Sequence, residues 1–348
     1  AVNTTAHNNT AVGYTASTAN TSGTENVAVG TAALATNSTG SYNTGVGYNA
    51  LTGLTTGVRN TAIGRTVMQG TTTGGYNTAV GMDCMQNVTT ASYNVGVGYN
   101  TMGGATNTGN ENTALGYEAL KLNTTGANNT AVGAKALDAN TTANNNTGIG
   151  YSALTANTTG IENTAVGSAA LDANTTGTNS TAVGYNALSA ATSAVNNVAI
   201  GSQALAATTA GPYNTAVGNN ALTANTTGHS NVAMGAYAMD ALTTGVEAVA
   251  IGAYALTAAS GSSNVALGYK AGTDTTTSSY NTAVGALAHT YLITGSGNNT
   301  GVGFRADAFN QTGSSNTAVG TYAAYGASGQ SHDYNTAIGA DSLKVLTT

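Results

Sequence analysis

The sequence predicts an all-β fold in which the chain winds into about twenty short coils stacked on one another, a β-solenoid. Two observations lead to this fold class. A five-residue motif, Asn-(Thr/Val)-(Ala/Gly)-apolar-Gly, recurs twenty times between Asn9–Gly13 and Asn335–Gly339, with Ser180 and Ala248 replacing Asn in two copies. Fifteen of the nineteen intervals between motif glycines are seventeen residues long. A coil of seventeen residues is too short to form a core by itself, and it can bury its apolar side chains only against the coils next to it. We therefore expect one elongated unit.

The first element of each coil is a short strand built on the motif. In the well-formed coil Asn163–Gly177, Thr164 and Val166 share one face and Ala165 points to the other. The residue before the motif Gly is always Val, Ile, Leu or Met, so we expect this column to lie in the core. The column includes Val12, Val29, Val46, Ile63, Val80, Val97, Val132, Ile149, Val166, Val183 and Ile200. The Ala or Gly column indicates that another sheet layer or another chain approaches closely.

A bend, a second short strand and a turn complete each coil. The motif Gly is invariant among the coils, which is typical of a left-handed bend or of a backbone contact that excludes Cβ. Leu or Met lies four residues later in fifteen of the twenty coils and forms a second expected core column. This column includes Leu137, Leu154, Leu171 and Leu188. An Asn-Thr-Thr-Gly segment such as 174–177 then predicts a turn, since Asn and Gly tolerate positive φ.

The motif Asn predicts a structural ladder. Stacked at the strand spacing of about 4.8 Å, amide side chains can bond to one another from coil to coil, as they do in cross-β stacks. We expect this role for Asn43, Asn60, Asn77, Asn129, Asn146 and Asn163.

Tyrosines are the candidate binding residues of the regular coils. Tyr48, Tyr99, Tyr151 and Tyr185 each follow a motif Gly. A semi-exposed row of Tyr can bind a glycan or a partner protein, and packing between coils or subunits is the favoured alternative.

The coils of residues 261–348 are less regular than those of residues 1–260, although they continue the same repeat. Gly272, His289, Asp307 and Ala324 replace the Leu or Met of the second core column in four successive coils. New bulky residues also occur, including Leu292, Ile293 and Phe309. We expect a change of core packing, with a widened receptor-contact region as the alternative. The candidate binding residues there are Tyr291, Phe304 and Tyr325.

The composition argues against several classes of function. With 7 basic and 13 acidic residues and no basic run, the chain lacks the positive footprint of a nucleic-acid-binding protein. No stretch approaches eighteen apolar residues, so we expect no membrane insertion. The four histidines, His7, His229, His289 and His332, occupy unrelated coil positions. We expect the acidic residues to project from the corners of the coils, too far apart for acid–base catalysis or a repeated metal site. The sequence therefore predicts no enzyme, no cofactor and no metal.

Two further observations concern Cys84 and the threonines. Cys84, the single cysteine, occupies a column that is usually Ala and is expected to be a small buried filler. A flat array of Thr could bind ice. However, the commonest Thr column alternates with Val and shares its face with the expected core, so ice binding is a remote alternative.

Two phrases carry a resemblance to known fibre proteins. Asn26-Val-Ala-Val-Gly30 and Asn197-Val-Ala-Ile-Gly201 resemble the head repeats of trimeric autotransporter adhesins of the YadA type. The longer phrase Asn-Thr-Ala-Val-Gly-Tyr-x-Ala-Leu, followed by Asn-Thr-Thr-Gly, resembles repeats of bacteriophage tail fibres. The resemblance covers about residues 8–340. The adhesin repeat is usually a few residues shorter, which indicates an enlarged turn at Asn-Thr-Thr-Gly in this chain.

This resemblance implies a left-handed parallel β-roll that assembles as an intertwined or side-by-side parallel homotrimer. It also implies an extracellular location on a virion or a cell. We expect the chain to be the structural and adhesive shaft of a bacteriophage tail fibre involved in host attachment. Its partners would be copies of itself and a host glycan or protein receptor. A bacterial surface adhesin or extracellular filament is the alternative, and an ice-binding solenoid is the remote one.

Overall fold

The computed structural model describes residues 5–258, 260–291, 297–326 and 333–344, and these residues form a parallel β-solenoid. The described part contains three-residue strands joined by turns and bends, and no helix. The predicted period is confirmed, because most neighbouring strands begin seventeen residues apart. The chain divides into two compact units, Ala1–Gly177 and Thr178–Thr348. This division does not test the predicted boundary at residue 260 between regular and less regular coils, which stays a prediction.

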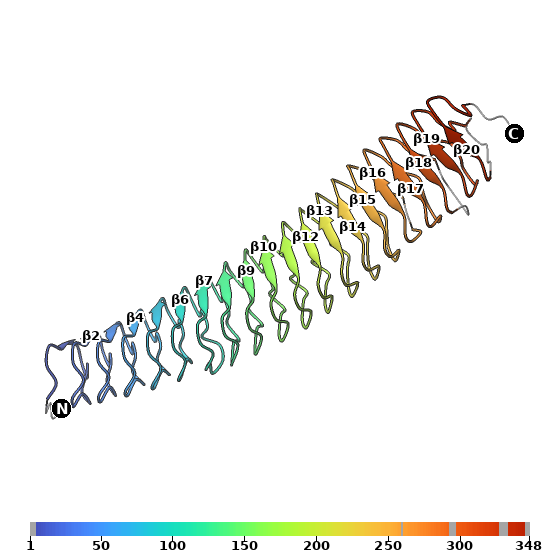
Figure 1. Ribbon diagram of the computed structural model, residues 1–348. Coiled ribbons are helices and arrows are strands. Elements are labelled where there is room, and N and C mark those ends of the chain that lie inside the picture. Colours follow the sequence, from blue (N-terminus) through green and yellow to red (C-terminus); the bar gives the residue numbers. More distant parts are fainter. Residues whose placement is uncertain (1–4, 259, 292–296, 327–332, 345–348) are drawn as a thin grey trace. The chain divides into compact units, whose positions relative to one another are not determined.

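The first unit contains ten described strands (Figure 1). They are β1 (Thr10–Val12), β2 (Val27–Val29), β3 (Thr44–Val46), β4 (Thr61–Ile63), β5 (Thr78–Val80), β6 (Val95–Val97), β7 (Thr113–Leu115), β8 (Thr130–Val132), β9 (Thr147–Ile149) and β10 (Thr164–Val166). Each strand pairs in parallel with the strand of the next turn, and equivalent residues face each other, as Val46 faces Ile63.

The second unit repeats this arrangement. Its described strands are β11 (Thr181–Val183), β12 (Val198–Ile200), β13 (Thr215–Val217), β14 (Val232–Met234), β15 (Val249–Ile251), β16 (Val265–Leu267), β17 (Thr282–Val284), β18 (Thr300–Val302), β19 (Thr317–Val319) and β20 (Thr336–Ile338). Pairing is again parallel and in register. The register is kept although the last strands begin 16 to 19 residues apart, because neighbouring three-residue strands pair residue for residue.

The expected second strand of each coil is not a strand. After most motif glycines the chain runs through turns in which two non-glycine residues adopt left-handed backbone angles, as Ala169 (φ 53°) and Leu171 (φ 51°) do. This segment still stacks through backbone bonds, for example from Leu137 N to Ala153 O at 3.0 Å. Left-handed angles cost an L-residue about 1–2 kcal/mol each. The repeated bonds between turns offset that cost.

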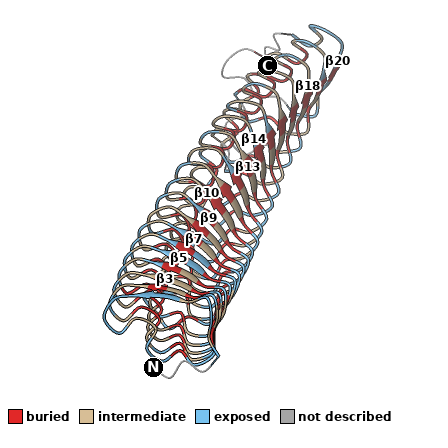
Figure 2. Cartoon of the chain, turned by 90° about the vertical axis from the view of Figure 1, so that its left-hand side faces the viewer, coloured by how far each residue is buried: buried red, intermediate tan, exposed pale blue. Residues whose placement is uncertain are grey.

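The core is narrow, and this corrects the expectation for the first apolar column. In most strands the middle residue is fully buried and its two neighbours are half-buried or exposed (Figure 2). Ala165 is buried, whereas Val12 is 58% exposed and Ile63 is 42% exposed. The alternation of side chains between two faces of the strand was correctly predicted. The Ala or Gly residue is the one that faces inward, because Leu side chains from the segment after the motif Gly already fill the interior. At Gly45, for example, an added Cβ would already lie 3.4 Å from Leu34 Cγ.

The residues that this correction moves out of the core fall into two groups. Val12, Ile63, Val80, Val97, Ile149 and Ile200 are exposed. Val29, Val46, Val132, Val166 and Val183 are half-buried.

The true core consists of the Ala or Gly column of the strands and of the segment after the motif Gly. Leu137, Leu154, Leu171 and Leu188 have no exposed surface, and neither have the Ala residues that precede them. Cys84 lies in that Ala column, and burial raises the pKa of its thiol to about 12. A thiol with so high a pKa is an unreactive core side chain.

The motif asparagines form the expected ladder inside the solenoid. Asn60 Nδ2 donates to Asn43 Oδ1 at 3.1 Å and to the carbonyl of Gly74 at 2.9 Å. The backbone N–H of each ladder residue also donates to the previous Asn, as Asn163 N does to Asn146 Oδ1 at 3.0 Å. Asn43, Asn60, Asn77, Asn129, Asn146 and Asn163 are all buried. Burying so many amides is tolerable because these bonds satisfy them.

A second amide ladder lies in the Asn-Thr-Thr-Gly turns, and sequence reasoning had assigned these asparagines only to turn geometry. The Nδ2 of Asn140, Asn157 and Asn174 donates to the Oδ1 of the Asn one turn earlier at 3.0, 3.1 and 2.9 Å. The Asn-Thr-Thr-Gly turn therefore supplies an additional buried column.

Candidate functional site

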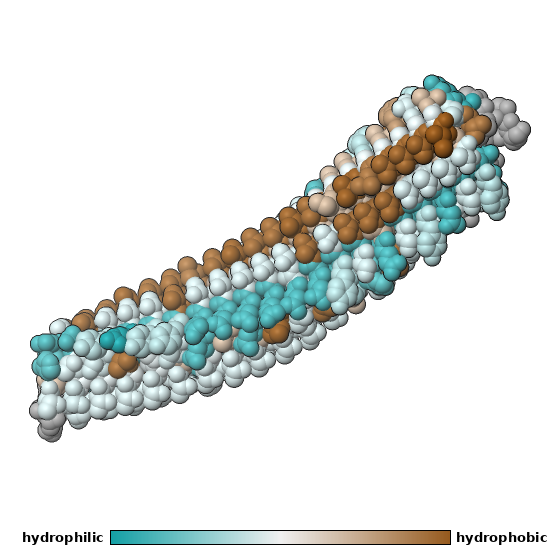
Figure 3. Space-filling model, in the orientation of Figure 1, coloured by the Kyte–Doolittle hydropathy of each residue, from teal (hydrophilic) through white to brown (hydrophobic). Residues whose placement is uncertain are grey.

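The most extended candidate site is the outward side of the strands. We call the first and third residues of every strand the outer strand face. The first column is Thr or Val and the third is Val, Ile, Leu or Met, so the face carries no charged residue. Within each unit the parallel register aligns these residues into continuous columns. Figure 3 shows apolar side chains gathered in rows that follow the stacking direction.

The apolar column of this face is unusually accessible. Ile63, Leu115 and Ile200 are 42%, 39% and 40% exposed, and Met234 is 43% exposed. Single exposed apolar side chains are ordinary on soluble proteins, but contiguous apolar patches mark interaction sites. Because this apolar column is exposed or half-buried in every described strand of each unit, the outer strand face has the chemistry of an interface.

The four tyrosines predicted in the regular coils lie beside this face, one residue after the motif Gly. Tyr48, Tyr99, Tyr151 and Tyr185 are 52%, 40%, 61% and 55% exposed. Of these four tyrosines, Tyr99 alone contacts another aromatic ring of the described residues. Its ring stacks on that of Tyr117, with the ring centroids 5.6 Å apart. The structure therefore exposes these residues but does not bring them together into one site.

The three candidates of the last coils do come together. Tyr291 stacks on Phe309 with ring centroids 4.5 Å apart, and Phe309 meets the edge of Tyr325 at 5.2 Å. Tyr325 contacts Tyr322 at 5.2 Å, and Tyr322 contacts Phe304 at 5.4 Å. We call these five residues the C-terminal aromatic cluster. Leu292 and Ile293 lie outside the described residues.

Cations border this cluster. Arg305 lies over the ring of Phe304 at 5.5 Å, and Lys344 lies over Tyr322 at 4.8 Å while also pairing with Asp341 at 2.6 Å. Sequence reasoning did not include Tyr322 in the site. A usable signal was present, because both phenylalanines of the chain fall within six residues of each other in one coil.

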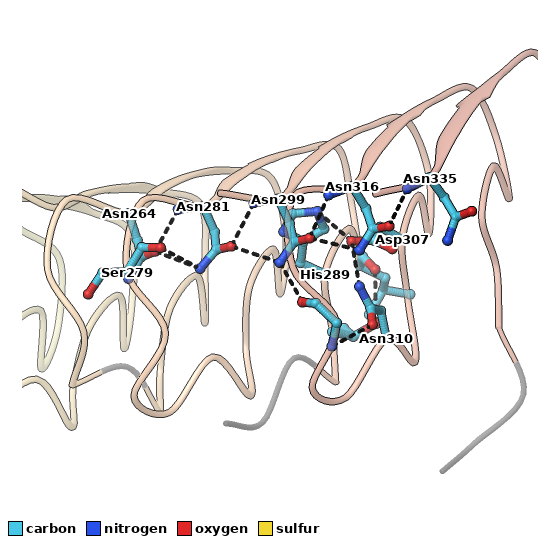
Figure 4. A network of polar contacts seen from close by, with 12 residues as sticks. Asn264, Ser279, Asn281, His289, Asn299, Asp307, Asn310, Asn316 and Asn335 are labelled. Atoms are coloured by element: carbon cyan, nitrogen blue, oxygen red, sulfur yellow. Dashed lines mark hydrogen bonds and ion pairs between the residues drawn. The ribbon is translucent and has the colours of Figure 1, made fainter. Parts of the chain in front are cut away.

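A buried pair of ionisable side chains lies beneath the same turns (Figure 4). His289 Nε2 is 3.4 Å from Asp307 Oδ2, and both residues have 0% exposure. Burial lowers the pKa of His289 to about 4 and raises the pKa of Asp307 to about 7, because each charged form loses its hydration. Asp307 thus contradicts the expectation that the acids project from the corners. His332 lies outside the described residues.

Two features are absent from the described part of the chain. No group of three or more His, Cys, Asp or Glu side chains is placed to hold a metal ion. No described helix has the length and apolarity needed to cross a membrane.

No protein-family model matches this chain, and no curated protein matches it.

Proposed function

We propose that this chain is the structural and adhesive shaft of an extracellular fibre in which three parallel copies pack through their outer strand faces. A bacteriophage tail fibre that takes part in host attachment is the preferred form of this proposal. One observation carries it: an uncharged column of Val, Ile, Leu and Met is accessible at turn after turn of each unit.

The energy available on this face supports assembly. Full burial of a Val or Ile side chain is worth about 1.5–3 kcal/mol, so covering a half-exposed one gives about 1 kcal/mol. Ten turns in a unit would then contribute about 10 kcal/mol. That figure is comparable with the cost of about 4–15 kcal/mol for bringing two partners together. Two units of this kind favour a stable assembly over a transient one.

The threefold and parallel arrangement and the left-handed coil rest on the resemblance of the repeats to YadA-type heads and phage tail fibres. A parallel arrangement also suits a repeat in which each turn offers the same face, because identical turns of neighbouring copies can meet at the same level. The phrase Asn-Thr-Ala-Val-Gly-Tyr-x-Ala-Leu favours the phage fibre. A bacterial surface adhesin or extracellular filament would use the same shaft.

Attachment would come from many weak contacts. A fibre of three chains repeats each exposed side chain three times, and multivalent presentation strengthens binding without any new contact. The exposed tyrosines and the C-terminal aromatic cluster are the surfaces we assign to a host glycan or protein receptor.

Ice binding is favoured by one specific observation and remains the second candidate. The Thr column was expected to share a face with the core, but Thr44 and Val46 both lie on the outer strand face, on either side of buried Gly45. A monomer would therefore display a regular array of Thr and Val on its strands. The two functions exclude each other on this face. A fibre requires the outer strand face to be covered by another copy of the chain, and ice binding requires it to be exposed to water.

The native mass of the full chain decides between them. We expect multi-angle light scattering to give three times the chain mass of 33.9 kDa at micromolar concentration. A monomer at all concentrations would contradict the fibre. Thermal hysteresis and the shape of ice crystals grown with that monomer would then test ice binding, and a monomer without such activity would contradict both functions.

A further inference from the structure

The buried Leu column is interrupted in four successive turns of the second unit. Gly272, His289, Asp307 and Ala324 occupy the position four residues after their motif glycines, where Leu or Met lies in fifteen other turns. All four are buried. Among the described residues that are fully buried, His289 and Asp307 are the only ones with a histidine, acidic or basic side chain. The interruption therefore places one unique polar pair inside a repetitive core.

The surroundings of the pair are shaped to hold it. At Gly301, the inward position of β18, an added Cβ would lie 2.5 Å from the Nε2 and Cδ2 atoms of His289, so glycine leaves the space that the imidazole fills. Asn310 Nδ2 lies 3.4 Å from Asp307 Oδ2. Backbone bonds join the turns, with His289 N donating to Ala306 O at 3.1 Å and Asp307 N donating to Ala323 O at 2.9 Å.

The remaining core contacts of these turns do not distinguish one turn from the next. Asn299 donates to Asn281, and Asn316 donates to Asn299, through the same pair of bonds at each step (Figure 4). The inward Ala or Gly and the motif Gly also recur in every turn. A chain that skipped one turn during folding would therefore find equivalent partners for these groups. Misassembly is a characteristic failure of repeat proteins.

The polar pair penalises such a skip from either side. If the turn of His289 is omitted, Asp307 stacks on the turn of Gly272 and its buried carboxyl loses the imidazole. If the turn of Asp307 is omitted, His289 stacks on the turn of Ala324 and loses the carboxyl. A buried ionisable group deprived of its partner is strongly unfavourable, and the best-attested use of buried polar groups is to set register.

We propose that His289 and Asp307 act as a register pin, which makes the turns of β17 and β18 stack on each other and on no other turn. The pair sacrifices some packing energy compared with two leucines. In return it marks as unique one step within the less regular repeats of residues 261–348.

Disulfide trapping in the full chain tests this pin. In a Cys84→Ala background, Leu287→Cys with Arg305→Cys reports the native register, because Leu287 and Arg305 lie two residues after successive motif glycines. Lys270→Cys with Arg305→Cys reports the omission of one turn. Equivalent positions in neighbouring turns are spaced as a disulfide requires, whereas positions two turns apart are not. Each reporter pair is refolded from denaturant, oxidised and quantified by mass spectrometry of the linked peptides.

The informative variant is His289→Leu with Asp307→Leu. Its matched control is His289→Asp with Asp307→His, combined with Gly301→Ala and Ala318→Gly so that the imidazole again faces a glycine on the next strand. The double leucine variant should fold, because Leu34 already packs against the inward Gly45 elsewhere in the chain. We expect its skipped-turn crosslink to rise at least about tenfold over the parent after refolding, since the penalty for an orphaned buried polar group is gone. The swapped variant should keep the parental ratio. A double leucine variant with the parental ratio would overturn the proposal, and so would a swapped variant that misregisters as often as the double leucine variant.

Discussion

Val46 and Ile63 face each other on the adjacent parallel strands β3 and β4, and both side chains point away from the core. Ile63 is 42% exposed and Val46 is half-buried. Two aligned apolar side chains on the outside of a sheet that is already complete inside are a feature of an interface, since they add nothing to the core of the single chain. This relationship recurs along each unit and leads to the first prediction.

Charge on the outer strand face should separate assembly from folding. If the proposed trimer forms through this face, Val46→Lys with Ile63→Lys should give the mass of a monomer, because desolvating two ammonium groups costs far more than the apolar contacts gain. The circular dichroism of the monomer should match that of the parent, because the two substitutions leave the buried side of the strands unchanged. Asn145→Lys, at an exposed corner of the same unit, is the control and should stay assembled. If the double lysine variant is as fully trimeric as the parent, the copies do not meet on this face.

Removing one rung of the Asn ladder should destabilise the chain itself. Asn60→Ala removes the Nδ2 donor of Asn43 Oδ1, and it removes the Oδ1 acceptor of both the backbone N–H and the Nδ2 of Asn77. We expect a loss of about 1–3 kcal/mol in the free energy of unfolding, measured with urea. Asn219→Ala is the matched control, because Asn219 is exposed, and it should change stability by less than about 0.5 kcal/mol. Equal effects of the two variants would show that the ladder is not a stabilising element.

The motif glycines should be far less replaceable than the glycines inside the strands. Gly64 has φ 141°, and a Cβ there would lie 2.3 Å from the carbonyl oxygen of Gly81. Gly148 occupies the inward strand position, where most turns have Ala and where a Cβ would meet Leu137 Cγ at 3.3 Å. We expect Gly64→Ala to cost about 3 kcal/mol or more, and Gly148→Ala less than about 1 kcal/mol. Urea unfolding of both variants checks the contrast, which would be wrong if the two costs were similar.

These glycines also show what could be predicted from the sequence. The period, the alternation across Thr164, Ala165 and Val166, the ladder of motif asparagines and the need for glycine at the bend all follow from patterns that repeat in register. Which of the two strand faces is buried could not be predicted from these patterns. Periodicity separates the two faces, but only the width of the interior decides which of them is buried. In this chain that width is set by Leu residues elsewhere in the coil.

The candidate binding residues show a second limit. Tyr48, Tyr99, Tyr151 and Tyr185 were correctly expected at the surface, yet the sequence could not indicate that they stay apart while Tyr291, Phe304 and Tyr325 meet. Their contact depends on Phe309 and Tyr322, which bridge neighbouring turns. The His289–Asp307 pair escaped notice for the same reason, since eighteen residues separate its members. Side chains in equivalent positions of adjacent turns are neighbours, and one copy of the repeat does not display that relationship.

That pair also leads to a prediction about pH, because its members titrate in opposite directions. Folding raises the pKa of Asp307 from 3.8 to about 7 and lowers that of His289 from 6.5 to about 4. Between pH 4 and pH 6.5 the folded and unfolded chains then each hold one proton on these two groups. Stability depends on pH only where the two states bind different numbers of protons. We therefore expect the pair to contribute almost no pH dependence to the parent chain in this range.

Removing either partner should reveal the dependence that the other partner hides. With Asp307→Asn, the unfolded chain binds a proton on His289 below pH 6.5 and the folded chain does so only near pH 4, so stability should fall as the pH falls through this window. With His289→Leu, the folded chain keeps the proton of Asp307 up to about pH 7 and the unfolded chain releases it near pH 3.8, so stability should fall as the pH rises. Each loss should amount to about 3–4 kcal/mol across its window.

Urea unfolding between pH 3.5 and pH 7.5 measures both slopes, and the His289→Leu, Asp307→Leu chain supplies the background from all other titrating groups. Subtracting that background should leave slopes of opposite sign for the two single variants and a nearly flat line for the parent. Two single variants with slopes of the same sign would show that the side chains do not remain buried as ionisable groups in the folded core.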